Sequence, residues 1–228
     1  MSNSNQTDFI ETTKSELSSI IDAIHNHEYI DALDKREIRK EKLEIFICEQ
    51  YHIIANDRRN FALMISKASS DTAGMLFTDC LHVEMDALKN LVIMAKELGI
   101  DNRIMECYEP LAGCQAYTNY LTRLAIYGSD AEILTALLID LPIWGANCSK
   151  ISSILKKHYR FNDQSCIFLD KFACPLPEEF ILKSKKLINN AVPEHRRNLR
   201  HVSRLLLDYE LLFWDTIYRY SKWPNANS

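Results

Sequence analysis

Two acidic residues stand in segments of the sequence that are otherwise almost entirely apolar. Asp140 falls within LLIDLPIW, residues 137–144, and Glu210 is followed by LLFW, residues 211–214. A carboxylate in such a segment is costly to bury unless it is hydrogen-bonded, metal-bound or protonated with a raised pKa. Two such acids in one pocket suit general acid/base catalysis, because their surroundings push their pKa values apart. The alternative is that each side chain faces solvent.

Aromatic and amide side chains could complete such a pocket. Tyr117 and Tyr120 are three residues apart and could donate hydrogen bonds to a ligand, or pack in a core with each hydroxyl bonded to a partner. Gln50 lies in the run EQYH, of which at most two residues can face one pocket of a helical bundle. Trp144 and Phe213 complete the predicted ligand-binding set.

A third group of residue types could bind metal. Asp79 and His82 are three residues apart on one expected helix face, and Glu84 follows closely. A carboxylate and a histidine at this spacing recur in di-metal helical bundles, in which several helices each supply ligands. The alternative is a surface or capping histidine.

The charge balance and the missing motifs exclude several function classes. The net charge is −4 and the pI is about 6.0, so no electrostatic footprint for nucleic acid is expected. The basic pairs Lys185-Lys186 and Arg196-Arg197 are interpreted as solvated helix faces. Neither a glycine-rich phosphate loop nor a nucleophile elbow occurs.

Cysteine usage and hydropathy indicate a cytoplasmic protein. The seven cysteines are odd in number and form no CxxC pair, which predicts neither a disulfide framework nor a zinc site. We expect no apolar run as long as the roughly 20 residues of a membrane helix, and therefore no membrane partner. The first residues, 1–7, are polar and lack the apolar centre of a signal peptide.

Apolar residues at helical spacing predict an all-α protein in which those side chains are positioned by long helices. Only five glycines occur among 228 residues, which argues against the many turns of a sandwich or barrel. We expect one domain over residues 1–228, with flexible ends at 1–6 and 224–228, built as an antiparallel bundle of seven to nine helices. The main expected helices cover residues 7–26, 35–69, 70–98, 110–127, a segment from Ser129, 177–191 and 193–220.

Three local features are expected to interrupt these helices. Asn56-Asp57 marks a break or kink in the second long helix. Pro142 removes a backbone hydrogen bond and should kink its helix. Pro193 suits the first turn of a helix and therefore indicates that the last long helix begins there.

Four segments together resemble the TenA/PqqC/CADD group of heme-oxygenase-like proteins. Residues 45–51, IFICEQY, are similar to the aromatic helix of TenA proteins that ends in Gln-Asp-Tyr. Residues 115–121, QAYTNYL, resemble its Tyr-Thr-x-Tyr-Leu helix. Residues 136–140, ALLID, resemble its Ala-Leu-Leu-Pro-Cys helix, and 210–214, ELLFW, its terminal Glu-x-x-Phe-Trp. The matches follow the order of the family from about residue 35 to 215.

This resemblance implies a small planar ligand of the thiamin or aminopyrimidine type. TenA proteins hydrolyse thiamin or its aminopyrimidine breakdown products, with a Cys nucleophile and a Glu beside the pyrimidine. The Glu falls on Glu210, the pocket Tyr on Tyr117, the Cys on Asp140, and a first carboxylate on Gln50. Asp140 is no thiolate but could act as a general base, so the resemblance implies C–N hydrolysis by Asp140 and Glu210 without a cofactor. A homo-oligomer is implied by the family.

Two alternatives stay open at this point. CADD-like relatives bind two irons through Glu and His and oxidise small organic molecules, and a chain of that kind would take iron through Asp79, His82 or Glu84. Its late helix holds Asp170 without a histidine at the required spacing. The other alternative is a non-catalytic binding or interaction protein, which a pocket filled by apolar side chains and a solvent-facing Asp140 would favour.

Overall fold

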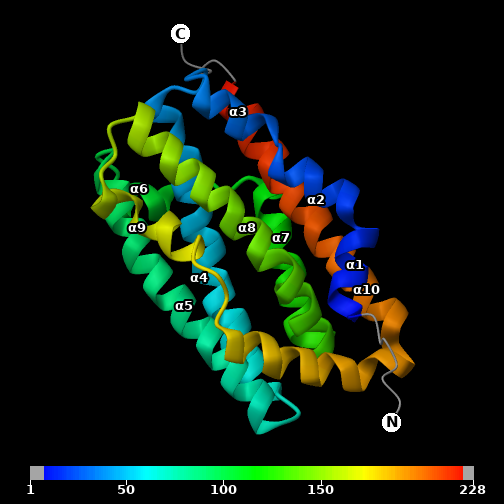
Figure 1. Cartoon of the computed structure of the whole chain (residues 1–228). Helices are drawn as coiled ribbons and strands as arrows, with labels where there is room; N and C mark the ends of the chain where they lie inside the picture. The colour runs from blue at the N-terminus through cyan, green and yellow to red at the C-terminus, as the bar shows by residue number, and fades with distance from the viewer. Residues whose placement is uncertain (1–7, 223–228) are drawn as a thin grey trace.

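The computed structural model describes residues 8–222, and every regular element in that range is a helix (Figure 1). The expected all-α bundle is therefore confirmed. The predicted flexible ends, residues 1–6 and 224–228, lie outside the described residues. In chain order the elements are α1 Phe9–Glu16, α2 Ser18–His25, α3 Glu28–Asp34, the 3-10 turn η1 Lys40–Lys42, α4 Leu43–Lys67, α5 Asp71–Lys96, α6 Asn102–Cys107, α7 Ala112–Tyr127, α8 Asp130–His158, α9 Asp163–Phe172 and α10 Glu178–Lys222.

Polar caps set where several of these helices begin. The Asp8 side chain accepts from the backbone of α1, and the Ser70 side chain does the same for α5. At α8, Ser129 and Glu132 form a reciprocal capping box. Gly99, with φ at +73°, follows the end of α5 in the left-handed conformation that glycine adopts without strain.

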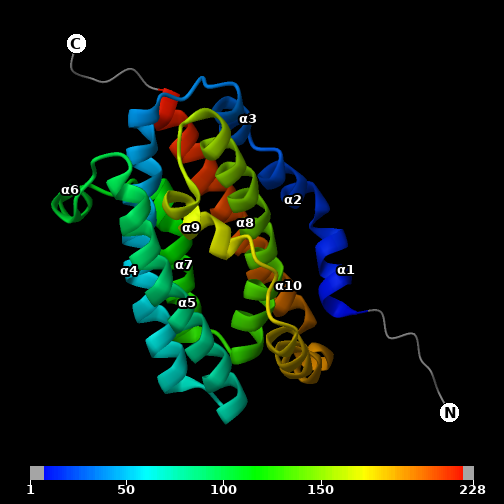
Figure 2. The same cartoon turned by 60° about the vertical axis from the view of Figure 1, so that its left-hand side comes forward.

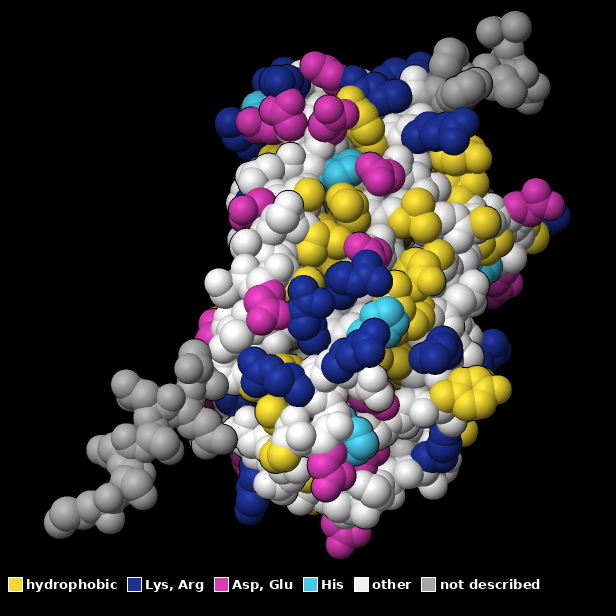
Figure 3. All heavy atoms as spheres, turned by 90° about the vertical axis from the view of Figure 1, so that its right-hand side faces the viewer, with side chains coloured by type: hydrophobic (Ala, Val, Ile, Leu, Met, Phe, Trp, Pro, Cys, Tyr) yellow, Lys and Arg dark blue, Asp and Glu magenta, His cyan; other side chains and the backbone are white. Residues whose placement is uncertain are grey.

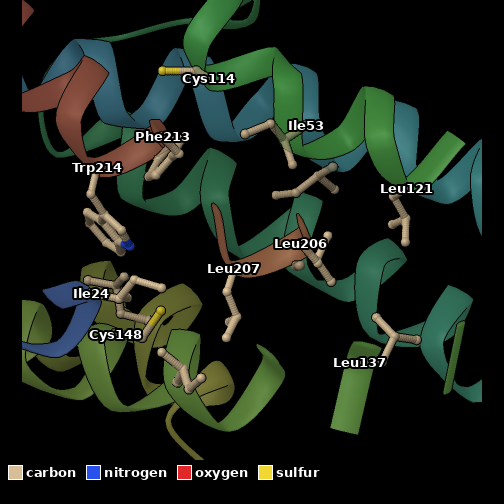
Figure 4. Close-up of a cluster of buried hydrophobic side chains, with 14 of the residues drawn as sticks. Ile24, Ile53, Cys114, Leu121, Leu137, Cys148, Leu206, Leu207, Phe213 and Trp214 are labelled. Carbon is tan, nitrogen blue, oxygen red and sulfur yellow. The ribbon is translucent and has the colours of Figure 1, made fainter. Parts of the chain in front are cut away.

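Five long helices, α4, α5, α7, α8 and α10, form the bundle that positions the site. Helix α10 packs against α8 and α7, while α4 packs against α5 and α7. The short helix α9 lies across α8 and α5, and α6 lies beside α4 (Figure 2). The core contains fully buried large side chains such as Trp214, and Ile24 and Cys148 lie opposite its indole (Figure 4). Each such side chain contributes about 1.5–3 kcal/mol through burial.

The boundaries differ from the predicted ones in informative places. The first expected helix is two helices, since α1 ends at Glu16 and α2 begins at Ser18. The break predicted at Asn56-Asp57 was wrong, since α4 runs through it and Asp57 is buried. Helix α8 runs from Asp130 to His158 through Pro142, which is exposed, so this proline does not end the helix.

The last two predicted helices are one. Helix α10 is 45 residues long and contains Pro193 in its interior. Figure 1 shows that its first part runs across the end of the bundle and that its last part turns to run along the bundle. A proline lacks the N–H that closes a helical turn, so it marks a bend here instead of a helix start.

Several basic residues of α10 contact α1 and its N-cap residue. Lys185 pairs with Asp8 at 2.5 Å and Arg200 pairs with Glu16 at 2.5 Å. The guanidinium of Arg196 lies 5.0 Å from the ring centre of Phe9. On this side of the molecule, Lys and Arg are interspersed with acidic and apolar side chains (Figure 3). The surface has mixed charge, as expected of a solvated helix face.

Helix α8 contains a longer apolar stretch than we expected from the sequence. An 18-residue stretch of it has a mean hydropathy of 1.2, which by length and composition would suit a membrane span. However, 72% of this stretch is buried inside the protein. This is the burial of a central core helix, and it leaves little apolar surface for lipid.

Candidate active site

A cavity lies among the helices where the two singled-out acids meet. The cavity has a volume of about 60 Å³, which is several times the roughly 10–15 Å³ of cavity volume that one water molecule needs. Six helices supply its wall. The lining residues are Gln50, Ile53, Ile54 and Asp57 from α4, Glu84 from α5, Tyr117 from α7, Asp140, Leu141 and Trp144 from α8, Phe172 from α9, and Glu210 and Phe213 from α10.

Asp140 is buried in this wall, with a relative exposure of 1%. The Tyr117 hydroxyl donates to Asp140 Oδ2 at 2.7 Å. Burial raises the pKa of Asp140 to about 6, while the bonds from Tyr117 and Glu210 act in the opposite direction. Asp140 is therefore a carboxylate that ionises close to neutral pH.

Glu210 is buried beside Asp140, with a relative exposure of 3%. Trp214, one turn along α10, donates its indole N–H to Glu210 Oε1 at 3.1 Å. Burial, followed by the charge of Asp140, raises the pKa of Glu210 well above its usual range, and a hydrogen bond with Asp140 raises it further. Burial and the neighbouring charge thus favour the protonated form of Glu210.

The remaining oxygens of this pair lack other partners. Asp140 Oδ1 and Glu210 Oε2 are both buried and accept no hydrogen bond from a donor in the described part of the chain. A ligand or water in the cavity can supply these missing bonds, as buried carboxyl oxygens require. The protonation of each acid affects that of the other.

Aromatic rings form a stiff wall next to the acids. The ring centre of Trp144 lies 6.1 Å from that of Phe213 and 6.1 Å from that of Phe172, in edge-to-face arrangements. Behind the wall, Phe46 stacks on Trp144 at 6.3 Å with an interplanar angle of 12°. These contacts restrict the rings to the orientations seen. Such a wall suits the face of a flat molecule.

Two further acids line the cavity. Asp57 is buried, and its Oδ1 accepts a close bond from the Thr118 hydroxyl and a 3.1 Å bond from Asn60. Burial raises the pKa of Asp57 to about 7, and burial together with the charge of Asp57 raises that of Glu84 well above its usual range. Sequence reasoning missed Asp57, because it lies in the polar run NDRRN where an acid is ordinary.

Most of the predicted ligand-binding residues lie in the cavity wall. Gln50, Tyr117, Trp144 and Phe213 all line it. Tyr120 does not: its ring packs 5.1 Å from that of Tyr209, outside the cavity, which corrects its assignment. Because three residues turn a helix by about 300°, Tyr117 and Tyr120 reach neighbouring but different surroundings.

The metal candidates do not come together. Asp79 and His82 are exposed on α5, whereas Glu84 points into the cavity. Among residues 8–222, no group of three His, Cys, Asp or Glu side chains is arranged to hold a metal ion. The spacing of Asp79 and His82 therefore reflects a solvent-facing helix surface. Asp170 is also engaged elsewhere, since it accepts from Ser152 at 2.5 Å and from Lys156 at 2.9 Å.

Glu49, next to Gln50, has a structural role that the sequence did not reveal. It is fully buried and accepts from the Tyr108 hydroxyl at 2.9 Å, the Leu111 backbone at 2.6 Å and the Gln115 amide at 2.7 Å. These three bonds tie the start of α7 to α4. They thereby fix the first turns of α7, on which Tyr117 faces the cavity.

The helical bundle with its internal cavity is similar to solved structures of one fold class. A domain with a heme oxygenase-like fold from Shewanella denitrificans superposes with a TM-score of 0.72 at 15% identity, and the match covers 96% of this chain and 94% of that one. At this identity the likeness shows the fold alone. The protein therefore has the heme-oxygenase-like fold.

The family follows from the sequence match. The model of the TENA/THI-4/PQQC family matches residues 14–220, and the chain belongs to this family. An aminopyrimidine aminohydrolase of Halalkalibacterium halodurans is 31% identical over 123 residues, which are 52% of this chain and 54% of that protein. An aminopyrimidine aminohydrolase of Helicobacter pylori is 22% identical over 210 residues, which are 85% of this chain and 91% of that protein.

Proposed function

We propose that this protein binds a small planar aminopyrimidine in the cavity and hydrolyses a C–N bond by carboxylate acid/base catalysis. The observation that carries the proposal is the Asp140–Glu210 pair, two buried acids that share one cavity and differ in pKa. Two acids with separated pKa values can act as base and acid in one reaction. The two related aminohydrolases support the substrate class.

In the proposed reaction, Asp140 is the general base. Its carboxylate accepts a proton from a water molecule while the water oxygen bonds to the carbon that carries the amine. Glu210 donates its proton to the departing nitrogen as the C–N bond breaks, and the nitrogen leaves as ammonia. The proton then passes from Asp140 to Glu210 through their hydrogen bond. One water is consumed, and the products are an alcohol and ammonia.

The neighbouring side chains hold these two groups in position. Tyr117 orients Asp140 through Oδ2, and Trp214 orients Glu210 through Oε1. This leaves Asp140 Oδ1 and Glu210 Oε2 for the reaction. The wall of Trp144, Phe213 and Phe172 would hold the flat ring and limit the entry of water, which strengthens the electrostatic effect of both acids.

Two alternatives from the sequence are less well supported. A non-catalytic protein was expected to have a pocket filled by apolar side chains and a solvent-facing Asp140, but Asp140 lines an open cavity and is buried. A di-iron oxidase needs a cluster of ligands, and the part of the chain described here contains no group of three suitable side chains. The proposed hydrolysis uses no cofactor.

The test is release of ammonia from aminopyrimidines by the purified protein. We expect turnover with pyrimidines that carry an aminomethyl arm, measured by coupled ammonia detection and by chromatography of the alcohol product. The matched control for variants of Glu210 is Asp208→Asn. Asp208 lies on α10 two residues before Glu210 and pairs with Arg204. Turnover at background level for the wild-type protein would remove the hydrolase proposal.

The cytoplasmic location and the homo-oligomeric state remain predictions from the sequence. Size-exclusion chromatography with light scattering measures the oligomeric state directly.

A further inference from the structure

The cavity is smaller than the ring that the proposed function places in it. A protein cavity that binds benzene has a volume of about 150 Å³. The cavity here has a volume of about 60 Å³, which is less than half of that. A substituted pyrimidine is larger than benzene, so part of the wall has to move outwards before such a ring can enter.

One lining residue differs from the others in how it is held. Eleven of the twelve lining side chains belong to the long helices α4, α5, α7, α8 and α10, which pack along the bundle. The twelfth is Phe172, the last residue of α9, a helix of only ten residues. Its side chain is partly exposed. Moving the end of a short helix breaks far fewer packing contacts than moving a long helix of the bundle.

The rest of α9 is held firmly. Asn162 and Ser165 form a capping box at its start. Near its other end, the Asp170 carboxylate accepts from the Ser152 hydroxyl at 2.5 Å and from Lys156 at 2.9 Å, and both donors lie on α8. A movement of the wall at α9 is therefore confined to the residues that follow Asp170.

The linker after Phe172 has few attachments. Residues 173–177 form no helix and connect α9 to the start of α10 (Figure 2). Cys174, Pro175 and Pro177 are exposed, and the two prolines have no N–H to donate. Within the described chain, no hydrogen bond joins these five residues to α4, α5, α7 or α8. The end of α9 can therefore move without breaking such bonds to the bundle.

Gly145 of α8 determines how closely this end of α9 approaches the cavity. A Cβ atom on Gly145 would lie 2.5 Å from the carbonyl oxygen of Phe172 and 3.9 Å from the Cα atom of Ala173. The nearer atom belongs to the backbone, so no change of rotamer could relieve the overlap. The missing side chain thus lets the end of α9 rest directly on α8, with the Phe172 ring 6.1 Å from that of Trp144.

We infer that Gly145 is a positioning residue that sets the size of the ring the cavity accepts, and that Phe172 is the part of the wall that moves outwards to admit it. This inference rests on the proposed function, which places an aromatic ring in the cavity. A side chain at position 145 would hold Phe172 further out. The cavity would then accept a larger ring.

The experiment compares the binding of two probes by calorimetric titration, which needs no turnover. One probe is 4-aminopyrimidine, and the other is 4-aminoquinazoline, in which a benzene ring is fused to the same aminopyrimidine. The variants are Gly145→Ala and Phe172→Ala. The matched control is Gly74→Ala on α5, because a Cβ atom there would meet only Ala68 Cβ, at an ordinary contact distance of 3.7 Å.

The wild-type protein and Gly74→Ala should prefer the single ring by at least about 100-fold, since one extra methylene alone can cost about 10- to 200-fold in a tight pocket. The preference should fall below about threefold in Phe172→Ala and to about tenfold in Gly145→Ala. A general loss of stability would weaken both probes alike and leave the ratio of their Kd values unchanged. An undiminished ratio in Phe172→Ala or in Gly145→Ala overturns the inference.

The folding of Gly145→Ala is itself informative. If the end of α9 gives way, the variant should fold, with the circular dichroism spectrum of the wild-type protein and a slightly lower Tm. A Gly145→Ala chain that does not fold would show that the end of α9 cannot move, which contradicts the inference.

The binding ratio also separates this inference from the proposed reaction. If the ratio falls as expected while the wild-type protein releases no ammonia from pyrimidines with an aminomethyl arm, the size limit stands and the hydrolase proposal falls. If ammonia is released but the ratio is the same in all variants, the hydrolase proposal stands and the size limit falls. If neither probe binds any of these proteins at millimolar concentration, both are refuted.

Discussion

The two acid pairs of the cavity are built differently. Asp140 and Glu210 each receive one donor, the Tyr117 hydroxyl and the Trp214 indole, and their other oxygens, Oδ1 and Oε2, receive none from the described chain. In the other pair, both donors go to Asp57 and Glu84 receives none from the described chain. Burial raises all four pKa values, so burial does not distinguish the pairs.

What distinguishes them is where a proton can move. In the proposed reaction, Asp140 accepts a proton and Glu210 donates one, and each acid affects the pKa of the other. Asp57 is held by a fixed network that favours its charge, which suits the binding of a donor group. The comparison predicts that changes at the first pair alter kcat and that changes at the second alter KM.

The largest effect is expected from Glu210→Gln. The amide has no proton to donate to the leaving nitrogen, so kcat should fall by about 10²- to 10⁴-fold, with KM changed by less than about threefold. Steady-state kinetics of ammonia release measure both. A variant in which KM alone rises would place Glu210 in binding and not in proton transfer.

Asp140→Asn should lose about 10²-fold or more in kcat and gain stability at alkaline pH. The pKa of Asp140 is about 6 in the folded protein and near 3.8 when unfolded, so the acid destabilises the fold as pH rises through that range. The amide cannot ionise, and the variant should be about 1–3 kcal/mol more stable at pH 8. Urea unfolding at pH 4 and pH 8 tests this. An equal difference at both pH values would contradict the assigned ionisation.

Tyr117→Phe should act through Asp140. Loss of the hydroxyl removes a bond that stabilises the ionised carboxylate, so the pKa of Asp140 rises. Activity needs the carboxylate and therefore increases with pH through this pKa. The acid limb of the kcat profile should move up by about one pH unit, with a small loss in kcat at pH 8. An unmoved acid limb would show that Tyr117 does not position this base.

The smallest effect is expected from Thr118→Val at the other pair. Removing one donor to Asp57 should raise KM by about fivefold for an aminopyrimidine substrate and leave the acid limb unchanged. Steady-state kinetics, together with a pH profile, check this. If the acid limb moved as it should in Tyr117→Phe, the two pairs would be one titrating unit and the comparison would fail.

The sequence located the first pair because each acid interrupts an apolar run. In a helical protein, such a run is core, and a carboxylate within it needs a partner. It missed Asp57, which stands in the polar run NDRRN, and it singled out Glu84 only as a metal candidate. Helical spacing also failed to separate Tyr117 from Tyr120, since the residues that they meet belong to other helices.

Most helical segments, the caps at Asp8, Ser70 and Ser129, and the bundle architecture follow from the sequence by itself, because apolar periodicity and capping are local properties. The division into α1 and α2 and the continuity of α10 through Pro193 do not. Only the tertiary structure decided which acids share a cavity and in which direction each pKa shifts. A pKa depends on burial and on charges and donors reached through space, and these come from α4, α5, α7, α8 and α10 together.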